Sequence, residues 1–424
     1  MFRPPRIALV AALLTLALPF SAAGDWPNWR GPERDSTSAE EKLPLRWSAE
    51  DNLCWKAPMT ALSGATPIVS GDRIFLQAAD GERLELWSLA AKDGSVVWKR
   101  PLDGGNRIPR KHNLSSPSPV TDGEHVWVMT GTGVVAAFDF AGKMLWRRDL
   151  QKDYGPFGIL WGYASSPLLV DGTLYIQVLH GMKTDDPSYV VALDGASGES
   201  RWKVERKTDA LLESPDAYTT PVLLEVGERR ELVISGADYV TGHDLASGKE
   251  LWRVGGLNPN REKNYRLVGT PVVTGDLLIV PSRVSPLLAL KIPPEGTPAV
   301  AWRLERAGDV PSPLTDGETL FIVNDRGILR RFDLDDGSEL GEPLRLGAGN
   351  HSASPVLAGG HLYAIDEKGT TAVVKVGDPA EIVAENQTPG FTLASPAVAD
   401  GRIYLRTDEF LYCVEMPPQT APAR

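Results

Sequence analysis

Short apolar runs separated by polar turns fill most of the chain, and one arrangement of them recurs. A small residue precedes a proline, two or three apolar residues follow, and a turn rich in Gly and Asp leads into a second apolar run, as in "SSPLLVDGTLYIQV" (165–178). Because Gly and Asp tolerate the positive φ angles of tight hairpin turns, each copy predicts two short antiparallel strands. The eight copies begin at Pro67, Pro119, Pro167, Pro221, Pro271, Pro313, Pro355 and Pro396.

A second phrase follows in each repeat and predicts another hairpin. It consists of an apolar strand that ends near Asp, a turn with Gly, and a strand that ends in Trp, as in "VVALDGASGESRW" (190–202). Four strands per repeat, at intervals of 41–54 residues between the prolines, are typical of β-propeller blades. We therefore expect an all-β, eight-bladed β-propeller of four-stranded antiparallel blades.

Tryptophan marks the end of the fourth strand in five repeats, and aliphatic residues near 342–346 and 380–386 take its place in the next two. The last repeat stops after its third strand, "FLYCVE" (410–415), while a lone fourth-strand phrase, "NLCWK" (52–56), stands near the start. We expect the N-terminal strand to complete the C-terminal blade, which closes the ring and leaves no open sheet edge. The tryptophans are Trp98, Trp146, Trp202, Trp252 and Trp302.

The only two cysteines, Cys54 and Cys413, fall in these two end segments. Pairing the strands outward from the turn places Ala137 opposite Leu145 in a complete repeat, and the same alignment places Cys413 opposite Cys54. This predicts a disulfide, which an exported protein can keep oxidised. For so long a loop the chain-entropy model gives a stabilisation of about 5–6 kcal/mol. Two buried free thiols are the alternative.

The first 23 residues have the pattern of a secretory signal peptide. Arg3 and Arg6 are basic, residues 7–18 are apolar but too few to span a bilayer, and small residues lead to Ala23. We therefore expect cleavage near Ala23, a periplasmic or secreted location, and a leader that is dispensable for folding. The expected organisation is a signal peptide (1–23), a leader (24–44), the propeller (45–416) and a Pro-rich tail (417–424).

The remaining chain shows no sign of a nucleic-acid or membrane partner. The net charge is −11, whereas binding to phosphates needs a basic face. No later stretch is apolar over the length that a membrane-spanning helix needs. We expect a monomer without a membrane span, whose partner is a protein or another envelope component.

The phrases "ALDGASGESRW" (192–202) and "GHDLASGKELW" (242–252) resemble the tryptophan-docking motif of propellers of the pyrroloquinoline quinone (PQQ) type. In that motif a small residue and a Gly of one blade receive the Trp of the next. From Pro67 to Glu415 the chain is similar to the PQQ-like β-propeller repeat family, quinoprotein-type propellers whose eight-bladed members include the BamB-like proteins. The opening "DWPNWRGPERDSTS" (25–38) resembles the leader of many exported PQQ-like proteins. The resemblance implies the fold but not the function, because propellers host unrelated activities.

The resemblance does not extend to the quinone cofactor. Quinone enzymes of this group carry two adjacent cysteines over the cofactor and bind a metal through clustered carboxylates and an amide. Here the cysteines lie 359 positions apart and the six histidines are scattered, and no Asp/Glu cluster has the spacing of metal ligands. We therefore expect no metal site and no cofactor, PQQ with Ca²⁺ included. The chain also lacks the acylated cysteine that is typical of BamB.

The connections that lead into the first strands share one face of a propeller and surround its channel. They hold aromatic and basic side chains of the kind that dominate binding hot spots. The alternative is that each aromatic ring packs on its neighbouring blade. The candidate binding residues are Arg110, His112, Trp161, Tyr163, Tyr218, Arg261, Tyr265, His351 and Phe391.

No nucleophile elbow, P-loop or dinucleotide fingerprint occurs in the sequence, and we predict no catalytic residue. The sequence therefore favours a non-catalytic binding or scaffolding protein, and the resemblance to BamB implies a role in cell-envelope protein assembly. The alternative is a PQQ-dependent oxidoreductase, or another enzyme that acts at the channel face.

Overall fold

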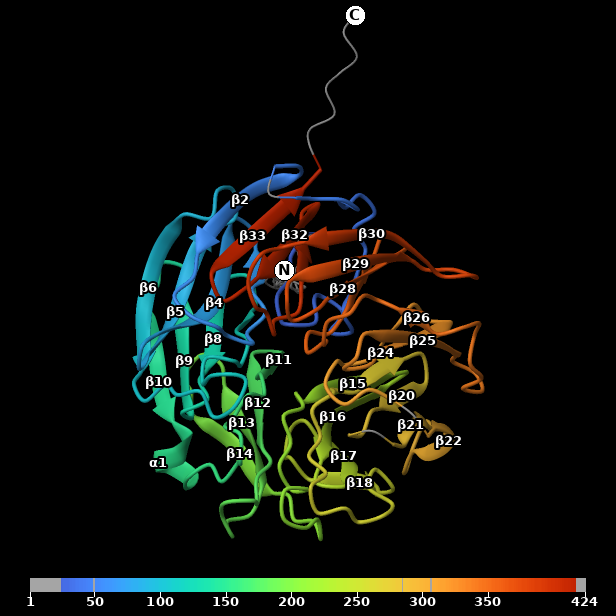
Figure 1. The fold of residues 1–424 in the computed structure, drawn as a ribbon. Helices are drawn as coiled ribbons and strands as arrows, with labels where there is room; N and C mark the ends of the chain where they lie inside the picture. Colours follow the sequence, from blue (N-terminus) through green and yellow to red (C-terminus); the bar gives the residue numbers. More distant parts are fainter. Residues whose placement is uncertain (1–23, 49, 284, 306, 417–424) are drawn as a thin grey trace, which may run out of the picture.

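The computed structural model describes residues 24–48, 50–283, 285–305 and 307–416, and the expected signal peptide and Pro-rich tail lie outside them. Eight blades surround a common centre (Figure 1), and the first strand of each blade begins directly after one of the eight repeated prolines. The predicted all-β, eight-bladed propeller is confirmed. In this part of the chain α1 (Leu150–Tyr154) is the one helix.

Blades 1–4 contain the following strands, from the innermost to the outermost. Blade 1 has β3 (Ile68–Ser70), β4 (Arg73–Asp80), β5 (Arg83–Ala90) and β6 (Val96–Asp103). Blade 2 has β7 (Val120–Thr121), β8 (His125–Met129), β9 (Val134–Asp139) and β10 (Met144–Asp149). Blade 3 has β11 (Leu168–Val170), β12 (Thr173–Val178), β13 (Tyr189–Asp194) and β14 (Ser200–Glu205). Blade 4 has β15 (Val222–Val226), β16 (Arg229–Gly236), β17 (Tyr239–His243) and β18 (Glu250–Val254).

Blades 5–8 continue in the same order. Blade 5 has β19 (Val272–Thr274), β20 (Leu277–Val280), β21 (Leu287–Lys291) and β22 (Ala299–Leu304). Blade 6 has β23 (Leu314–Thr315), β24 (Thr319–Val323), β25 (Ile328–Asp333) and β26 (Leu344–Arg345). Blade 7 has β27 (Val356–Ala358), β28 (His361–Ile365), β29 (Thr370–Lys375) and β30 (Glu381–Gln387). Blade 8 has β31 (Ala397–Ala399), β32 (Arg402–Arg406), β33 (Phe410–Glu415) and, from the N-terminal region, β2 (Leu53–Pro58).

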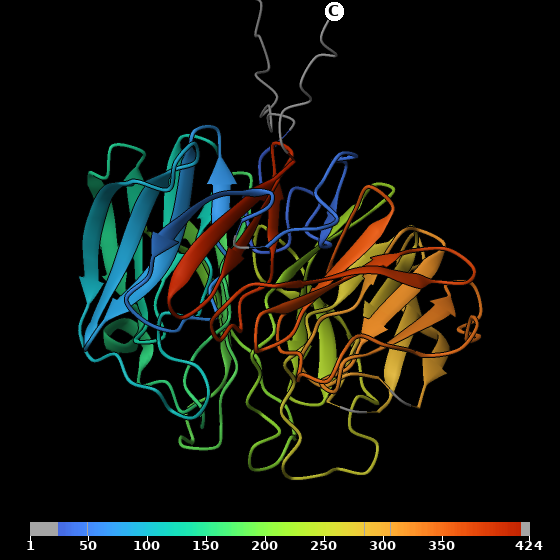
Figure 2. The ribbon, with the colours of Figure 1, turned by 45° about the horizontal axis from the view of Figure 1, so that its top comes forward.

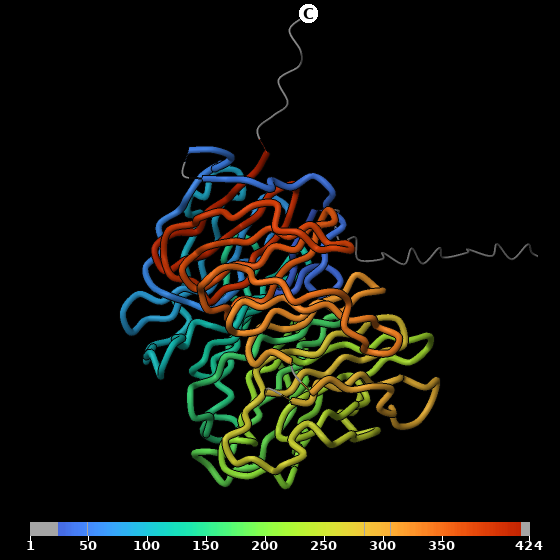
Figure 3. Tube along the Cα trace, turned by 45° about the vertical axis from the view of Figure 1, so that its right-hand side comes forward, coloured from blue at the N-terminus to red at the C-terminus, as the bar shows by residue number. Residues whose placement is uncertain are grey.

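The strand β2, near the N-terminus, pairs with the last strand, β33, and closes the ring as predicted, so that strands from the two ends of the chain lie side by side (Figures 1 and 3). The predicted register is wrong by one residue. Cys413 pairs with Trp55, just as Ala137 pairs with Trp146, because the strand shifts register at the residue before each tryptophan. Such a β-bulge inserts an extra residue that the ladder leaves unpaired, and in blade 8 this residue is Cys54.

The two cysteines are neighbours, but both are free thiols in the structure. Burial raises the pKa of the Cys413 thiol, and the adjacent Cys54 adds to the rise. Burial also raises the pKa of Cys54, with a further contribution from Glu415. The disulfide therefore stays a prediction.

Tryptophans of the fourth strands join neighbouring blades. Trp146 donates its Nε1–H to the Gly195 carbonyl at 2.7 Å, and its indole packs on Gly198, which has φ +75°. The resemblance implies that a blade receives the Trp of the next blade, whereas here each Trp docks on the blade that follows its own around the ring. Trp252 differs, because it donates to Glu231 of its own blade. The tryptophans that dock like Trp146 are Trp55, Trp98, Trp202 and Trp302.

The leader crosses one end of the channel (Figure 2) and is integrated into the fold. Trp26 is fully buried and exchanges two backbone hydrogen bonds with Val69 of blade 1, at 2.8 and 2.9 Å. At blade 7, which only blade 8 separates from blade 1, Leu357 donates its N–H to the Ser36 carbonyl, and β1 (Thr37–Ser38) extends the blade as a parallel strand. The leader thus contributes contacts to three or more blades, and its dispensability for folding stays a prediction.

Candidate functional site

The wall of the central channel is built from the segments that precede the eight prolines. The residue before a proline is confined to extended conformations, and side chains alternate along an extended chain. Side chains one and three positions before each proline therefore point the same way, and both sets line a common cavity.

The residues at these positions form two stacked rings of eight. The deep ring consists of Thr66, Ser118, Ser166, Thr220, Thr270, Ser312, Ser354 and Ser395, and every member carries a hydroxyl group. The upper ring consists of Gly64, Ser116, Ala164, Tyr218, Val268, Val310, Ser352 and Leu393.

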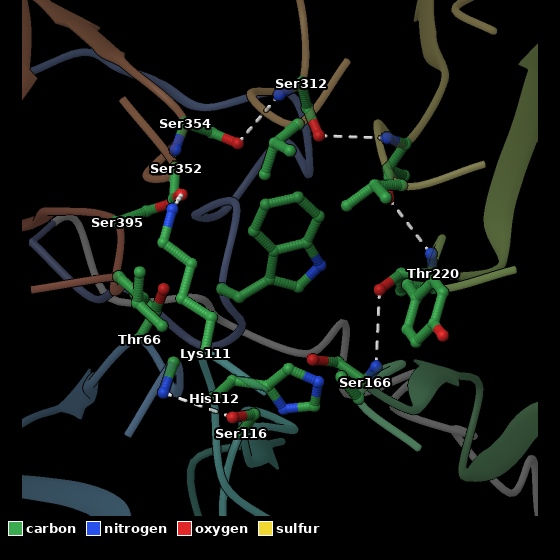
Figure 4. A pocket seen from close by; sticks show the side chains of 18 of the residues that line it. Thr66, Lys111, His112, Ser116, Ser166, Thr220, Ser312, Ser352, Ser354 and Ser395 are labelled. Carbon is green, nitrogen blue, oxygen red and sulfur yellow. Dashed lines mark hydrogen bonds between the residues drawn. The ribbon is translucent and has the colours of Figure 1, made fainter. Parts of the chain in front are cut away.

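Hydrogen bonds link the deep ring from blade to blade (Figure 4). The backbone N–H of one member donates to the hydroxyl oxygen of the next, through seven bonds that run from Thr66 to Ser395 with N···O distances of 2.9–3.4 Å. The bonds tie the inner strands together around the channel. Each accepting hydroxyl uses one lone pair in this way and keeps its O–H hydrogen and a second lone pair.

The leader closes the channel below the deep ring. Trp29 lines the cavity. The guanidinium group of Arg30, which does not line the cavity, lies 5.4 Å from the centroid of the Trp29 ring. Arg30 is buried and donates to the carbonyls of Pro271 (3.0 Å) and Pro313 (2.6 Å). Burial lowers its pKa to about 10, and the Asp35 carboxylate opposes this. The floor turns the channel into a cavity of about 680 Å³ whose mouth lies among the connections between blades.

Trp161 stands at the mouth and is fixed by residues that precede blade 4. Its Nε1–H donates to Glu213 Oε1 at 2.9 Å, its backbone N–H donates to the Tyr218 hydroxyl at 3.2 Å, and the guanidinium of Arg110 lies 5.0 Å from its ring centroid. Asp216 accepts three backbone N–H bonds from this region. Burial raises the pKa of Asp216 to about 6, and the three donors oppose the rise.

Two pairs of oppositely charged side chains stand at the mouth. Arg266 lies 3.4 Å from Asp309, and Lys111 pairs with Glu367. Burial raises the pKa of Asp309 to about 6, and Arg266 opposes the rise. Burial also lowers the pKa of His112, so its imidazole is uncharged at neutral pH. Below the mouth, both rings consist of uncharged residues.

Four of the nine candidate residues line the cavity, namely Arg110, His112, Trp161 and Tyr218. The other five lie elsewhere. The buried Tyr163 and Tyr265 donate their hydroxyl groups to backbone carbonyls, which is the packing role given as the alternative. His351 is also buried, Arg261 pairs with Asp209 at the surface, and Phe391 is bound through its backbone to Asp408.

Sequence reasoning missed the deep ring and the floor. The signal for the ring was present, because Ser or Thr precedes every one of the eight prolines. It was interpreted only as a small residue before a turn. Trp29 lies in the leader, whose sequence does not repeat, so nothing in the periodicity could assign it to the channel.

The described lining can be compared with the residues that hold a quinone cofactor and its metal in the quinone enzymes. Among the described residues, no three His, Cys, Asp or Glu side chains come together as metal ligands. Cys54 and Cys413 lie on the two outermost strands of blade 8 rather than at the cavity. The described lining thus has neither the carboxylate cluster nor the adjacent cysteines of the quinone enzymes.

Comparisons with known proteins agree with the fold. A sequence model of the family described as "Outer membrane protein assembly factor BamB" matches residues 45–153 and 102–342. A BamB of Bordetella pertussis is 22% identical over 352 residues, which cover 81% of this chain and 80% of that protein.

Solved structures of other proteins superpose on this fold. The crystal structure of BamB from Moraxella catarrhalis superposes with a TM-score of 0.60 at 16% identity, and the match covers 85% of this chain and 98% of that chain. A europium-containing methanol dehydrogenase superposes with a TM-score of 0.69 at 12% identity, covering 92% and 91%. At such identities these likenesses show the fold alone.

Proposed function

The chain belongs to the BamB family of PQQ-like β-propellers, and from this membership we propose that it is a non-catalytic binding protein that acts in the assembly of outer-membrane proteins. The observation that carries the proposal is the family match, which extends over residues 45–342 and so over more than half of the chain. A rigid ring that presents loops on one face suits a scaffold, because loops held by a rigid framework commonly carry binding residues.

Exposed apolar side chains on the mouth face support a protein partner. Ile108, Met182, Leu211 and Leu212 all lie in connections on this face and are at least 36% exposed. Leu212 also has φ +53°, a conformation that costs a residue with a side chain about 1–2 kcal/mol. An apolar side chain held outward by a strained turn is explained more readily by contact with a partner than by folding.

We place the protein in the periplasm. The proposal rests on the signal-like pattern of residues 1–23 and on the family. Cleavage near Ala23 is part of it, and sequencing the N-terminus of the exported protein tests it. Within the described residues, no helix is long and apolar enough to cross a membrane.

We also propose that the protein works without PQQ. One reason is that the described residues contain no group of metal ligands. The other is that both cysteines lie on the outermost strands of blade 8, away from the cavity. Titration with PQQ and Ca²⁺ should leave both the absorbance of PQQ and the melting temperature unchanged, because a ligand that binds only the native state raises its stability. Saturable stabilisation would overturn this view and favour an oxidoreductase.

The binding role is tested by capture from envelope extracts. The exported protein should retain a component of the outer-membrane assembly machinery, and Leu212→Asp should reduce this retention. Leu251→Asp is the matched control, because Leu251 is similarly exposed (47% against 53%) but lies on the outermost strand of blade 4. No retained component, or equal retention by both variants, would contradict a partner bound at the mouth face.

A further inference from the structure

The channel cavity has the dimensions of a small-molecule site. Its volume of about 680 Å³ falls within the range of about 300–1,000 Å³ that such sites occupy. The two rings of the wall are two residues apart along extended chains, which separates them by about 6.6 Å. A ligand of two linked six-membered rings would therefore reach from the Trp29 floor to the mouth.

The deep ring can both donate and accept hydrogen bonds. Seven of its hydroxyl groups accept a backbone N–H from the neighbouring blade. Each keeps an O–H hydrogen and a lone pair for a ligand. A ligand rich in hydroxyl groups matches this wall, since each of its own hydroxyls also donates and accepts.

The distribution of charge favours a neutral ligand. Both rings are uncharged, and the charged pairs Arg266–Asp309 and Lys111–Glu367 stand at the mouth. The buried cation below the floor, Arg30, already directs its guanidinium donors to Ser36 and to backbone carbonyls. A charged group deep in the cavity would lose its hydration without gaining a counter-ion, which is costly.

Apolar surface is available on the floor and on one arc of the wall. Trp29 provides an indole ring, and Val268 and Val310 lie side by side in the upper ring. A pyranose sugar has C–H groups on its ring faces and hydroxyls around its edge. It can therefore stack on an aromatic ring while its edge bonds to a polar wall.

We propose that the channel cavity binds a neutral disaccharide, with one sugar ring stacked on Trp29 and its hydroxyl groups bonded to the deep ring. The site is separate from the apolar loops of the mouth face, and the proposal does not rest on the protein partner proposed above.

The test is a binding measurement on the intact exported protein with a panel of neutral disaccharides, namely maltose, trehalose, cellobiose and N,N′-diacetylchitobiose, at millimolar concentration. Calorimetry gives the affinity, and tryptophan emission reports on the floor. At least one sugar should bind saturably. Cellobionate, the anionic counterpart of cellobiose, tests the charge assignment. Binding by no neutral sugar, or by cellobionate alone, would overturn the proposal.

A blocking variant, its control and a second blocking variant locate the site. Ala164→Phe projects a ring from the upper ring into the cavity and should weaken binding at least about tenfold. Ala301→Phe places the same ring on the exposed outermost strand of blade 5 and should leave affinity unchanged. Val268→Phe blocks the cavity from another blade and serves if Ala164→Phe fails to fold. Full binding by folded, blocked variants would place the ligand outside the channel and refute the assignment.

Trp29→Leu tests the stacking. The variant should weaken binding about threefold to tenfold, the effect expected from an aromatic contact beyond its buried area, and the sugar-dependent change in emission should shrink with it. An unaltered affinity would exclude Trp29 as the platform.

Discussion

The docking of Trp146 on Gly198 gives a direct test of what holds neighbouring blades together. Alanine at position 198 would place its methyl carbon 2.6 Å from two carbon atoms of the Trp146 ring. Carbon atoms pack at about 3.5–4.0 Å, so the indole has to move by about 1 Å. The movement would also disturb the 2.7 Å bond from Trp146 Nε1 to the Gly195 carbonyl.

The expected cost follows from these two effects. Forcing a methyl group into a packed contact costs about 1–3 kcal/mol, and losing the indole hydrogen bond adds about 0.5–1.5 kcal/mol. Gly172 in the same blade separates these effects from backbone strain. Its φ of +69° is close to the +75° of Gly198, but nothing lies within 4 Å of its added Cβ atom. In both variants the alanine has a left-handed backbone conformation, which destabilises the fold by about 1–2 kcal/mol. Only in Gly198→Ala does the added methyl group contact the tryptophan.

Urea unfolding followed by far-ultraviolet circular dichroism measures the difference. Gly198→Ala should lose about 1.5–4.5 kcal/mol more than Gly172→Ala, the sum of the two effects above, and its native tryptophan emission should change. Equal losses from the two variants would refute the reasoning, because the cost would then come from backbone conformation alone.

Three further predictions concern the ends of the chain and the mouth of the channel. Deleting residues 24–44 should lower the melting temperature in differential scanning fluorimetry, because it removes the buried Trp26 and Arg30. An unchanged melting temperature would support a dispensable leader. Oxidised protein should show no free thiol when denatured, and Cys54→Ser should have a lower melting temperature than the unaltered protein. Titration of two thiols in the denatured protein would exclude the disulfide. Stability should fall as pH rises from about 4 to 6, because burial raises the pKa of Asp309 from 3.8 in the unfolded chain to about 6. Asp309→Asn should make this fall shallower without abolishing it, because Asp216, whose pKa burial also raises to about 6, still contributes. Urea unfolding at each pH measures the profile, and an unaltered slope would show that Asp309 does not contribute.

The fold could be read from the sequence because its determinants are local and repeated. A proline before each first strand, a Gly turn and a closing Trp recur in fixed order, and they predicted the blade number, the ring closure and the face that bears the connections. The register of Cys54 was missed because a bulge adds one residue without changing the hydrophobic pattern. Tyr163 and Tyr265 were assigned to the binding face because exposed and buried aromatic residues look alike in a sequence.

The site was predictable only in part, for a related reason. Trp161 and Tyr218 line the channel through connections that the repeat locates. The cavity floor depends instead on contacts between a unique segment and strands far away in the chain, such as the bonds from Arg30 to Pro271 and Pro313. No local pattern encodes such contacts.

The leader also sets an order of events during folding. It precedes every blade in the chain, yet its hydrogen-bond partners lie at blades 1, 2, 3, 5, 6 and 7. The complete set of contacts can therefore form only after blade 7, and we expect the leader to dock after the ring has assembled, because contacts between residues so far apart in sequence form slowly. Hydrogen exchange during refolding can follow this step. The Val69 amide, which is bonded to the Trp26 carbonyl, should gain protection after the interior of β4, and earlier protection would show that the leader docks before the ring is complete.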